Sequence, residues 1–471
     1  MKTAFLLTPT KSWILLLILG FFAFFFQLQK PVVREWDEAT YGINAYEMSQ
    51  SHHPIVVTFM GNSDVYNSKP PMGLWFMAFS THVFGFNTFA LRFPSALFSF
   101  LLCLFLFYFI LKRFQNIYWA FYTAAILMAS IGFTGWHEAR SGDFDAMVAV
   151  AICLYTIYFI SALQDKSSSK LNWSFVFISI ACLIKGVYGL VALPGLFAFM
   201  FIQEDWRWAF KQRQLYLGFL SFLTVFFGYY ALREFLSPHY IQAVLQNEIG
   251  ERVFLETNIH KEEIPFYYHS YKLLAYRFQP FILFIPFALA MLWFEPKGKQ
   301  KHFLTGIFLA TISIWCIISF SKTKLVWYDG SLYPVLAIMI AWWLAKKDLQ
   351  LQKYFCVAIT CMVIFVSYLN VHEKDSFQFP HFLQSLRSEK NISKRIVVVS
   401  KNFEHPIRYY LLQDSLAGYK SCFTKSTKEL QIGTLALVRQ DEFEQELKGE
   451  FKLELLDSLG NDKLYELLDR K

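Results

Sequence analysis

The chain has 471 residues, of which 55% are hydrophobic, 19% aromatic and only 17% charged. About a quarter of the residues in a soluble globular domain are charged, so this composition excludes an ordinary soluble protein and indicates that much of the chain lies in lipid. The formal net charge of +8 could suggest nucleic acid as a partner. The basic residues instead cluster between apolar runs, which is the pattern of membrane topology signals and excludes a nucleic-acid-binding surface.

A helix needs about 20 mostly apolar residues to cross a bilayer, and about eleven such runs predict an all-α polytopic membrane protein. The predicted spans are residues 12–30, 91–111, 117–135, 146–163, 172–184, 187–203, 214–233, 276–294, 302–320, 328–345 and 353–370. The first run lacks a small-residue cleavage site, so we expect an uncleaved span there and not a signal peptide. The run 72–85 is too short to span, which favours a helix lying at the membrane interface.

When the N-terminus is placed inside and the spans alternate, every connection on the inner side is basic, as the positive-inside rule requires. These connections contain Lys112, Arg113, Lys166, Lys170, Arg207, Lys211, Arg213, Lys297, Lys299, Lys301, Lys346, Lys347 and Lys353. The outer side then holds residues 31–71, 136–145, 234–275, 321–327 and everything after about 371. We therefore expect the functional site on the outer side.

The segment 371–471 is charged and predicts a small α/β domain on the outer side, separate from the membrane domain 1–370. Strands are expected at Ile396–Val399 and Thr434–Val438, and helices around Ile407–Leu412 and at 442–447 and 462–469.

An acidic pair, Asp37-Glu38, follows the first apolar run, and Lys69 precedes the second. Carboxylates directly after a span are costly unless water, a cation or a basic partner meets them. A carboxylate can act as a general base or bind a cation, and a lysine is a point-charge partner for a phosphate. The alternative interpretation is a pair of juxtamembrane carboxylates and a snorkelling lysine. Residue type alone leaves both open.

A second cluster lies in the loop before the fourth span and consists of His137, Glu138, Arg140, Asp143 and Asp145. Asp145 begins the next helix, where the helix dipole favours an anion. Helix capping would explain one of the two aspartates, but it does not explain the whole cluster.

The remaining candidates lie between the fifth and sixth spans and in two later outer loops. They are Lys185, Glu248, Arg252, His260, Lys322, Lys324 and Tyr328. Lysines on the outer side run against the positive-inside rule, and an anionic ligand such as a lipid phosphate would give a reason for them. Snorkelling lysines and an interfacial aromatic belt are the alternative.

The order of these motifs over about residues 10–345 resembles the GT-C membrane glycosyltransferases of the dolichyl-phosphate-mannose–protein mannosyltransferase type. Among them it is similar to the bacterial 4-amino-4-deoxy-L-arabinose transferases that modify lipid A. The motifs are Asp-Glu after the first span, Lys-Pro before the second, an Arg…Asp loop before the fourth, Lys-Gly after the fifth, an Arg…His…Pro-Phe-Tyr-Tyr loop, and Ser-Lys-x-Lys…Tyr. The family's Asp-Glu-Thr-Arg-Tyr is replaced here by Asp-Glu-Ala-Thr-Tyr at 37–41, which lacks the arginine.

The resemblance implies a GT-C fold and transfer of a sugar, with inversion, from a polyprenyl-phosphate carrier. The acceptor would be lipid A, a glycan or a protein on the extracytoplasmic face of the bacterial inner membrane. It implies catalytic roles for Asp37 and Asp145, which are also the candidate ligands of a divalent cation; no other cofactor is expected. The substrate-binding residues it implies are Glu38, Lys69, Arg140, Asp143, Lys185, Glu248, Arg252, His260, Lys322, Lys324 and Tyr328.

Two other functions compete with this one. A polyprenyl-lipid transporter or flippase would use the same lipid-facing spans and lysines without breaking a bond. It predicts ionisable residues inside the spans, and the apolar runs are nearly free of them. A non-catalytic scaffold gives no cause for the clustering of Asp, Lys, Arg and His on one side.

Overall fold

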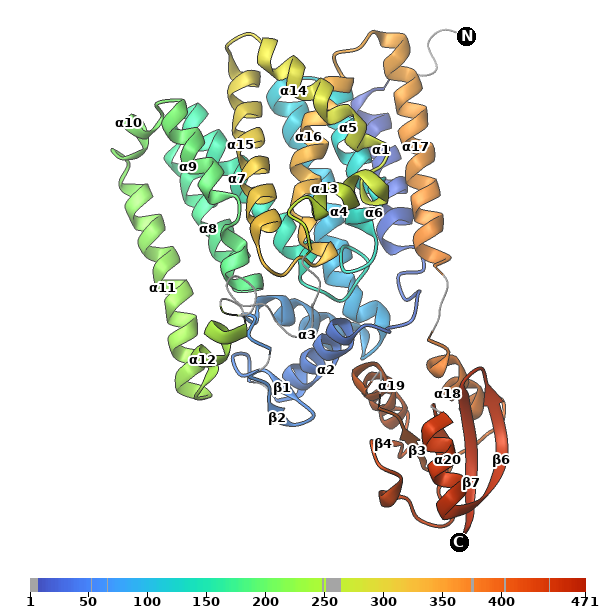
Figure 1. Cartoon of the computed structure of the whole chain (residues 1–471). Helices are drawn as coiled ribbons and strands as arrows, with labels where there is room; N and C mark the ends of the chain where they lie inside the picture. The colour runs from blue at the N-terminus through green and yellow to red at the C-terminus, as the bar shows by residue number, and fades with distance from the viewer. Residues whose placement is uncertain are drawn as a thin grey trace.

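The computed structural model describes residues 7–51, 53–65, 67–247, 250, 264–373, 377–401, 404–439 and 441–471. Its larger part is a bundle of helices that run side by side, and a small domain with a sheet lies beyond one end of the bundle (Figure 1). The helices α2 and α3 lie at the same end as the small domain (Figure 1). The first loop and the C-terminal domain therefore share one side of the bundle.

Within the described residues, six helical segments are long and apolar enough to cross a membrane. They are α4 (Thr88–Phe114), α7 (Asp145–Asp165), α8 with the 3₁₀ turn η2 (Ser168–Leu190), α11 (Arg213–Leu236), α15 (Lys299–Phe320) and α17 (Leu349–Val371). A seventh crosses if the bent pair Tyr268–Arg277 and Phe281–Phe294, which meet at 115°, acts as one span. Shorter apolar helices are α1 with η1 (Pro9–Phe25), α3 (Met72–Phe84), α5 (Ile117–Met128), α9 (Leu193–Ile202) and α16 (Leu332–Leu344).

Each predicted span coincides with one of these helical segments, so the class of multi-pass helical membrane protein is confirmed. The count of eleven stays a prediction, because several of the helices have only 10–17 residues. The bent pair corresponds to the predicted span 276–294, and it is built from the short elements α13 (Tyr268–Lys272), η4 (Leu273–Arg277), η5 (Phe281–Phe284) and α14 (Ile285–Phe294). The other short elements are α6 (Ile131–Thr134), α10 (Trp206–Ala209), α12 (Tyr240–Val244) and η6 (Val326–Asp329).

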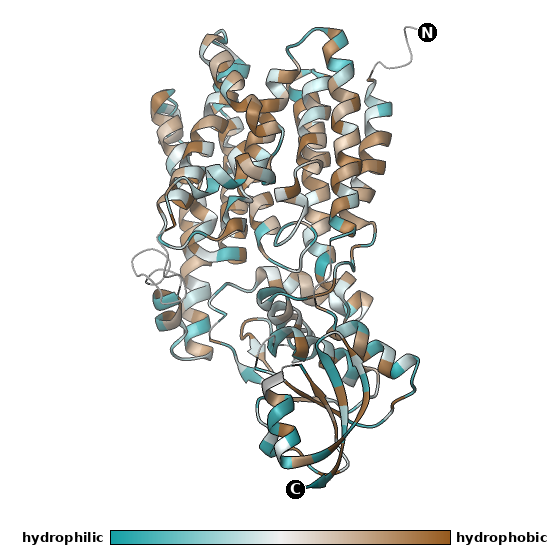
Figure 2. Cartoon of the chain, turned by 45° about the vertical axis from the view of Figure 1, so that its right-hand side comes forward, coloured by the Kyte–Doolittle hydropathy of each residue, from teal (hydrophilic) through white to brown (hydrophobic). Residues whose placement is uncertain are grey.

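The helix α7 forms the centre of the bundle. In its most apolar window 89% of the residues are buried, against 11% in α11, so α11 presents most of its surface outward. Apolar residues cover the helices of the bundle, whereas polar residues dominate the small domain (Figure 2). Helices α9 and α15 approach closely at Gly195, where a Cβ atom would lie 2.1 Å from the backbone oxygen of Leu309.

The first loop folds into the helix α2 (Trp36–Ser51), a hairpin of β1 (Thr58–Phe59) and β2 (Asn62–Ser63), and α3. Helix α2 begins with Asp37 and Glu38 in its first turn, where the helix dipole stabilises negative charge. Helix α3 coincides with the apolar segment predicted at 72–85.

The C-terminal domain has a five-stranded sheet with the strand order β4-β3-β5-β7-β6. Its elements are α18 (Phe379–Ser388), β3 (Ile396–Val399), α19 (Glu404–Leu416), β4 (Cys422–Thr424), η7 (Thr427–Glu429), β5 (Leu435–Val438), α20 (Asp441–Glu450), β6 (Phe451–Leu459) and β7 (Asp462–Arg470). Strand β3 pairs in parallel with β4 and β5, and β7 pairs antiparallel with β5 and β6. The expected small α/β domain is present.

The helix predicted at 462–469 is wrong, because this segment is the strand β7. Its leucines recur at a spacing that also fits a helix, since Leu464, Leu467 and Leu468 stand three and four residues apart. The turn before it decides the structure: Gly460 adopts φ +59 and connects β6 to β7 as a hairpin. Pairing with β5 then buries Leu464 and Leu467 in the sheet.

The C-terminal domain contacts the bundle through α19, which packs on α2. The backbone N–H of Val33 donates to the Tyr410 hydroxyl at 2.6 Å in a buried position. A Cβ atom on Gly42 would lie 2.7 Å from the Tyr409 ring, and the Tyr409 ring also packs on Phe86 with centroids 4.9 Å apart. The helix that carries Asp37 is thus held between the bundle and the C-terminal domain.

Candidate active site

Helix α2 places the two predicted carboxylates in different environments. Asp37 is half-buried, whereas Glu38 is buried and only 3% exposed. Glu38 accepts from Nε of Arg92 at 2.7 Å and from Nη2 of the same residue at 2.9 Å. The backbone N–H of Gly142 donates to Glu38 at 2.7 Å. Glu38 therefore joins α2, α4 and the loop 135–144, and its role in substrate binding stays a prediction.

The Arg92 side chain extends this connection to the end of the first membrane helix. Its Nη1 donates to the backbone oxygens of Leu28 at 3.1 Å and Pro31 at 2.7 Å. Arg140 makes a similar connection, donating through Nη2 to the backbone oxygens of Phe26 and Gln27, both at 3.0 Å. Two arginines thus bind the backbone carbonyl groups of the segment that follows the first membrane helix.

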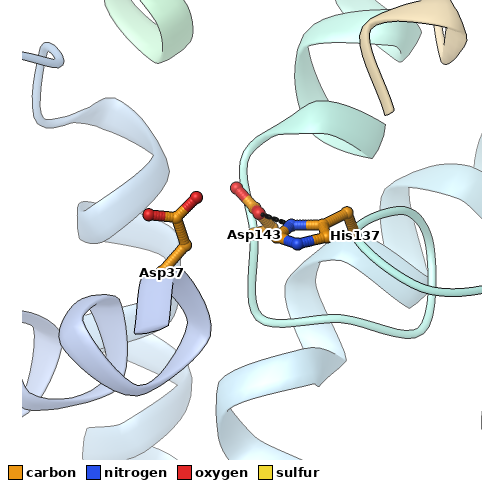
Figure 3. A group of neighbouring side chains, drawn as sticks. All are labelled: Asp37, His137 and Asp143. Atoms are coloured by element: carbon orange, nitrogen blue, oxygen red, sulfur yellow. Dashed lines mark hydrogen bonds and ion pairs between the residues drawn. The ribbon is translucent and has the colours of Figure 1, made fainter. Parts of the chain in front are cut away.

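Asp37, His137 and Asp143 meet in front of α2 (Figure 3). The three residues come from two segments, and one potential ligand atom of each lies within 4.8 Å of the others. The Nδ1 of His137 is hydrogen-bonded to Asp143 Oδ2, while the Asp37 carboxylate points toward this pair without a bond to it in Figure 3. The imidazole of His137 stacks on the Trp327 ring with centroids 3.7 Å apart and an interplanar angle of 17°.

The charges of this cluster support one another. Burial lowers the pKa of His137, but the hydrogen bond and the negative charge of Asp143, together with Asp145 and Asp37, outweigh it and raise the pKa above its usual value. Burial raises the pKa of Asp143, but the hydrogen bond and charge of His137 outweigh it and lower the pKa. Both effects favour an imidazolium–carboxylate pair beside Asp37.

The same three residues have the chemistry of a cation site. Two carboxylates and an imidazole suit a divalent ion, provided that the imidazole is neutral. The candidate ligands that lie together are therefore Asp37, His137 and Asp143. The ligands predicted from the sequence were Asp37 and Asp145, and Asp145 is not in this group.

Asp145 belongs to a second, deeper pair. It is 3% exposed and accepts a hydrogen bond from the Lys185 ammonium, which is itself 5% exposed. The ammonium also lies over the rings of Tyr188 and Tyr328, 5.1 Å and 5.3 Å from their centroids. Three predicted residues (Asp145, Lys185 and Tyr328) are therefore brought together in this buried group.

A third group lies behind the cluster and contains Glu138. Arg277 binds Asp329 through Nε at 2.9 Å and Nη2 at 2.8 Å, and its Nη2 lies 4.0 Å from Glu138. Among the described residues neither carboxylate oxygen of Glu138 has a hydrogen-bond partner. Burial, reinforced by the charge of Asp145, raises the pKa of Glu138 well above its usual value. The neutral carboxylic acid is thus favoured.

Lys69 stands at the edge of the cluster. Its ammonium lies 5.6 Å from the centroid of the Tyr41 ring, and that ring stacks on Phe144, which follows Asp143. Since Tyr41 is four residues after Asp37 on α2, the two share one helix face. Lys69 and Asp37 therefore lie on the same side of α2.

The later outer loops are only partly described. Lys324 is 9% exposed and donates to the backbone oxygen of Ser321 at 2.8 Å. Burial and the neighbouring Lys322 lower the pKa of Lys324. The predicted residues Glu248, Arg252 and His260 lie outside the described residues.

Several residues of these groups were missed from the sequence. Arg92, Arg277 and Asp329 fall inside the predicted spans 91–111, 276–294 and 328–345. An ionisable residue within an apolar run is costly and is by default a functional or pairing residue. Each of the three residues carries this signal, although the spans as a whole are poor in charge.

The arrangement defines a polytopic membrane protein whose carboxylates, imidazole and lysine gather at the end of the bundle that faces a small α/β domain. Residues 68–230 match the family described as dolichyl-phosphate-mannose–protein mannosyltransferase. The solved structure of ArnT from Cupriavidus metallidurans bound to undecaprenyl phosphate has the same fold. It superposes with a TM-score of 0.74 at 15% identity, covering 97% of this chain and 98% of that chain.

Two curated relatives are similar in sequence. Undecaprenyl phosphate-alpha-4-amino-4-deoxy-L-arabinose arabinosyl transferase 2 from Sodalis glossinidius (strain morsitans) is 27% identical over 65% of this chain. The arabinosyl transferase of the corresponding name from Shewanella sediminis (strain HAW-EB3) is 25% identical over 80% of this chain. The chain spans 54% and 70% of the length of these two relatives. It therefore has the GT-C fold and is similar in sequence to these undecaprenyl phosphate-alpha-4-amino-4-deoxy-L-arabinose arabinosyl transferases.

Proposed function

We propose that the chain is an inverting glycosyltransferase that takes a sugar from a polyprenyl-phosphate carrier and passes it to an extracytoplasmic acceptor at the bacterial inner membrane. The names of the curated relatives support this class of donor, with 4-amino-4-deoxy-L-arabinose as the first sugar to test. The observation that carries the proposal is the half-buried Asp37 carboxylate, which faces a charged His137–Asp143 pair. Asp37 also shares a helix face with Tyr41, and the Lys69 ammonium lies over the Tyr41 ring.

The reaction breaks the bond between the anomeric carbon and the phosphate oxygen and forms a bond from that carbon to an acceptor oxygen. The polyprenyl phosphate leaves with the bonding electrons, and the acceptor hydroxyl loses a proton. Asp37 is the base that accepts this proton. If the acceptor is a phosphate that is already ionised, Asp37 orients it and removes no proton.

Positive charge is needed where the phosphate departs, because the transition state resembles an oxocarbenium ion with a negative leaving group. Lys69 supplies that charge as a mobile ammonium. The cation of His137 is hydrogen-bonded to Asp143 and orients that carboxylate beside Asp37. The buried Asp145–Lys185 pair fixes the end of the loop 135–144, because Asp145 directly follows it.

The test is sugar transfer by purified protein in nanodiscs, with an undecaprenyl-phosphate-linked 4-amino-4-deoxy-L-arabinose donor and lipid A as acceptor. We expect Asp37→Asn to lower kcat about 100-fold or more, which is the low end of what general-base catalysis contributes. Asp348→Asn is the matched control, because Asp348 caps α17 in another part of the chain and asparagine caps helices equally well. Transfer by Asp37→Asn at the rate of the control would overturn the assignment of the base.

A further inference from the structure

Trp36 is exposed at a position where exposure needs an explanation. It begins α2, directly precedes Asp37, and 54% of its surface is exposed. Tryptophans near a membrane commonly insert at the level of the lipid headgroups. This indole instead packs on His405 of the C-terminal domain, with ring centroids 4.5 Å apart. It therefore belongs to the junction between the bundle and the small domain.

His405 is held between two aromatic rings and a hydroxyl group. It also stacks on Phe59 of the strand β1, with centroids 4.7 Å apart and an interplanar angle of 24°. Its Nδ1 lies 2.8 Å from the Thr40 hydroxyl. Segments from α2, the hairpin β1–β2 and the C-terminal domain thus converge beside Asp37, where α19 lies next to α2 (Figure 1).

The hydrogen bonds determine which ring nitrogen of His405 carries the proton. The Thr40 hydroxyl has one hydrogen, and it donates to the backbone oxygen of Trp36 at 2.6 Å. The hydroxyl must therefore accept from Nδ1–H of His405. Burial, with smaller contributions from Arg408 and Lys425, lowers the pKa of His405 to about 4, although Glu404 raises it. The ring is then neutral, and its Nε2 is a hydrogen-bond acceptor.

These groups combine an aromatic face with a fixed acceptor atom. A sugar ring offers the complementary surface, because its axial C–H groups form an apolar face and its hydroxyl groups donate hydrogen bonds at the rim. Binding sites for small polar ligands commonly pair aromatic walls with a few placed polar atoms. The pair Trp36–His405 therefore suits a saccharide ring.

We propose that Trp36 and His405 form the acceptor subsite and bind a saccharide ring of the acceptor, with the indole under the ring and His405 Nε2 accepting a hydroxyl hydrogen. The subsite rests on the proposed transferase function and deepens it. Asp37 follows Trp36 in the first turn of α2, so a ring on the indole lies at the same end of this helix as the base. The C-terminal domain then takes part in acceptor recognition through His405.

The experiment measures initial rates against lipid A concentration at saturating undecaprenyl-phosphate-linked donor. We expect Trp36→Ala to raise the acceptor KM about tenfold, since stacking on an aromatic side chain contributes about this much. Trp36→Phe, which keeps an aromatic face, should stay within about threefold of the wild type. Neither variant should change the donor KM or kcat by more than about twofold, since the proposed subsite binds the acceptor.

His405→Asn provides a second variant that does not depend on the indole. Its amide can donate to Thr40 in place of Nδ1 but has no atom at the Nε2 position, so the acceptor KM should rise while thermal stability is retained. Trp173→Ala is the matched control, because Trp173 on α8 is similarly exposed, at 51%, and lies outside this cluster. The control should leave both KM values unchanged.

The outcomes separate the subsite from the function. A wild-type protein that transfers no sugar from the polyprenyl donor to lipid A or to any peptide would overturn the proposed function. Wild-type transfer to lipid A with an unchanged acceptor KM in Trp36→Ala and His405→Asn would overturn the subsite alone. Transfer to a serine-containing peptide in preference to lipid A would also overturn it. A rise in the donor KM instead of the acceptor KM would show that Trp36 and His405 bind the donor, and it would overturn the acceptor subsite.

Discussion

His137 is the residue at which the charge and the packing of the candidate site meet. It adopts a positive φ of 60°, stacks on Trp327 and is hydrogen-bonded to Asp143. A non-glycine residue in this backbone conformation is uncommon and is retained where the surroundings hold it. The conformation turns the imidazole toward Asp37 and away from the membrane helices behind it.

The His137–Asp143 pair predicts a window of pH in which the site is intact. The folded pKa of His137 is raised, so its stabilisation is fully present below the unfolded value of 6.5 and is lost as the pH rises through the folded pKa. The folded pKa of Asp143 is lowered, so its stabilisation is present above the unfolded value of 3.8 and is lost as the pH falls through the folded pKa. We expect the melting temperature and kcat/KM to fall on the alkaline side of this window.

The measurement is kcat/KM and Tm from about pH 5 to about pH 9, where His titrates. His137→Gln should be slower at every pH and should lose the alkaline decline. His302→Gln is the control, because His302 forms the corresponding pair with Asp205 at 2.9 Å in another part of the bundle. An alkaline decline that persists in His137→Gln would assign it to another group.

At the residue scale, the sequence predicts which residues belong to the candidate site better than it predicts which of them pair with one another. Asp37, Asp143 and His137 all stand in the clusters that were singled out, and the structure brings them together. The partner of Glu38 was not predictable from spacing, because Arg92 lies 54 residues further along the chain. Pairing at that separation depends on how α2 and α4 pack, which no local pattern reports.

At the scale of elements, α2 is held by both parts of the chain. Glu38 is bound to Arg92 of α4, and α19 of the C-terminal domain packs on the same helix face at Gly42 through Tyr409, while Tyr410 binds the backbone just before α2. Helices of this length are marginal on their own in water. The direction in which Asp37 points therefore depends on tertiary contacts from both parts of the chain.

The hydroxyl of Tyr410 tests this support. Tyr410→Phe removes the acceptor of the buried Val33 N–H, and leaving such a donor without a partner costs about 1–3 kcal/mol. We expect a lower Tm and faster proteolytic release of the C-terminal domain. Tyr354→Phe is the control, since that side chain is on α17 and 61% exposed. Equal Tm values for the two variants would show that the contact contributes nothing to docking.

Elements whose structure is set by the local sequence are predictable, whereas those set by long-range pairing are not. Long apolar runs predict membrane helices, because the bilayer requires about 20 apolar residues with internal hydrogen bonds. Strand β3 was predicted at its observed bounds, Ile396–Val399, because four β-branched residues in succession fit a buried parallel strand. Strand β7 was mistaken for a helix because its pairing with β5 and β6 is long-range.

At the scale of the whole molecule, the distribution of charge divides the protein into two ends. The candidate site, the first loop and the C-terminal domain lie at one end of the bundle (Figure 1). The basic connections predicted for the inner side include Lys297, Lys299 and Lys301, which flank the start of α15. The positive-inside rule predicts that these lysines face the cytoplasm, so we propose that the site faces the extracytoplasmic side.

Single-cysteine labelling tests this orientation in intact cells. All seven cysteines are unpaired and six of them lie in apolar segments, so replacing them by serine or alanine gives a background for one introduced cysteine. Ala417→Cys lies on the exposed surface of the C-terminal domain, and Lys299→Cys lies on the exposed start of α15. A membrane-impermeant maleimide should label the first in intact spheroplasts and the second only after the membrane is broken. Labelling of Lys299→Cys alone in intact spheroplasts would show the opposite orientation. The Asp37 site would then face the cytoplasm, and the polyprenyl donor would have to react before it crosses the membrane.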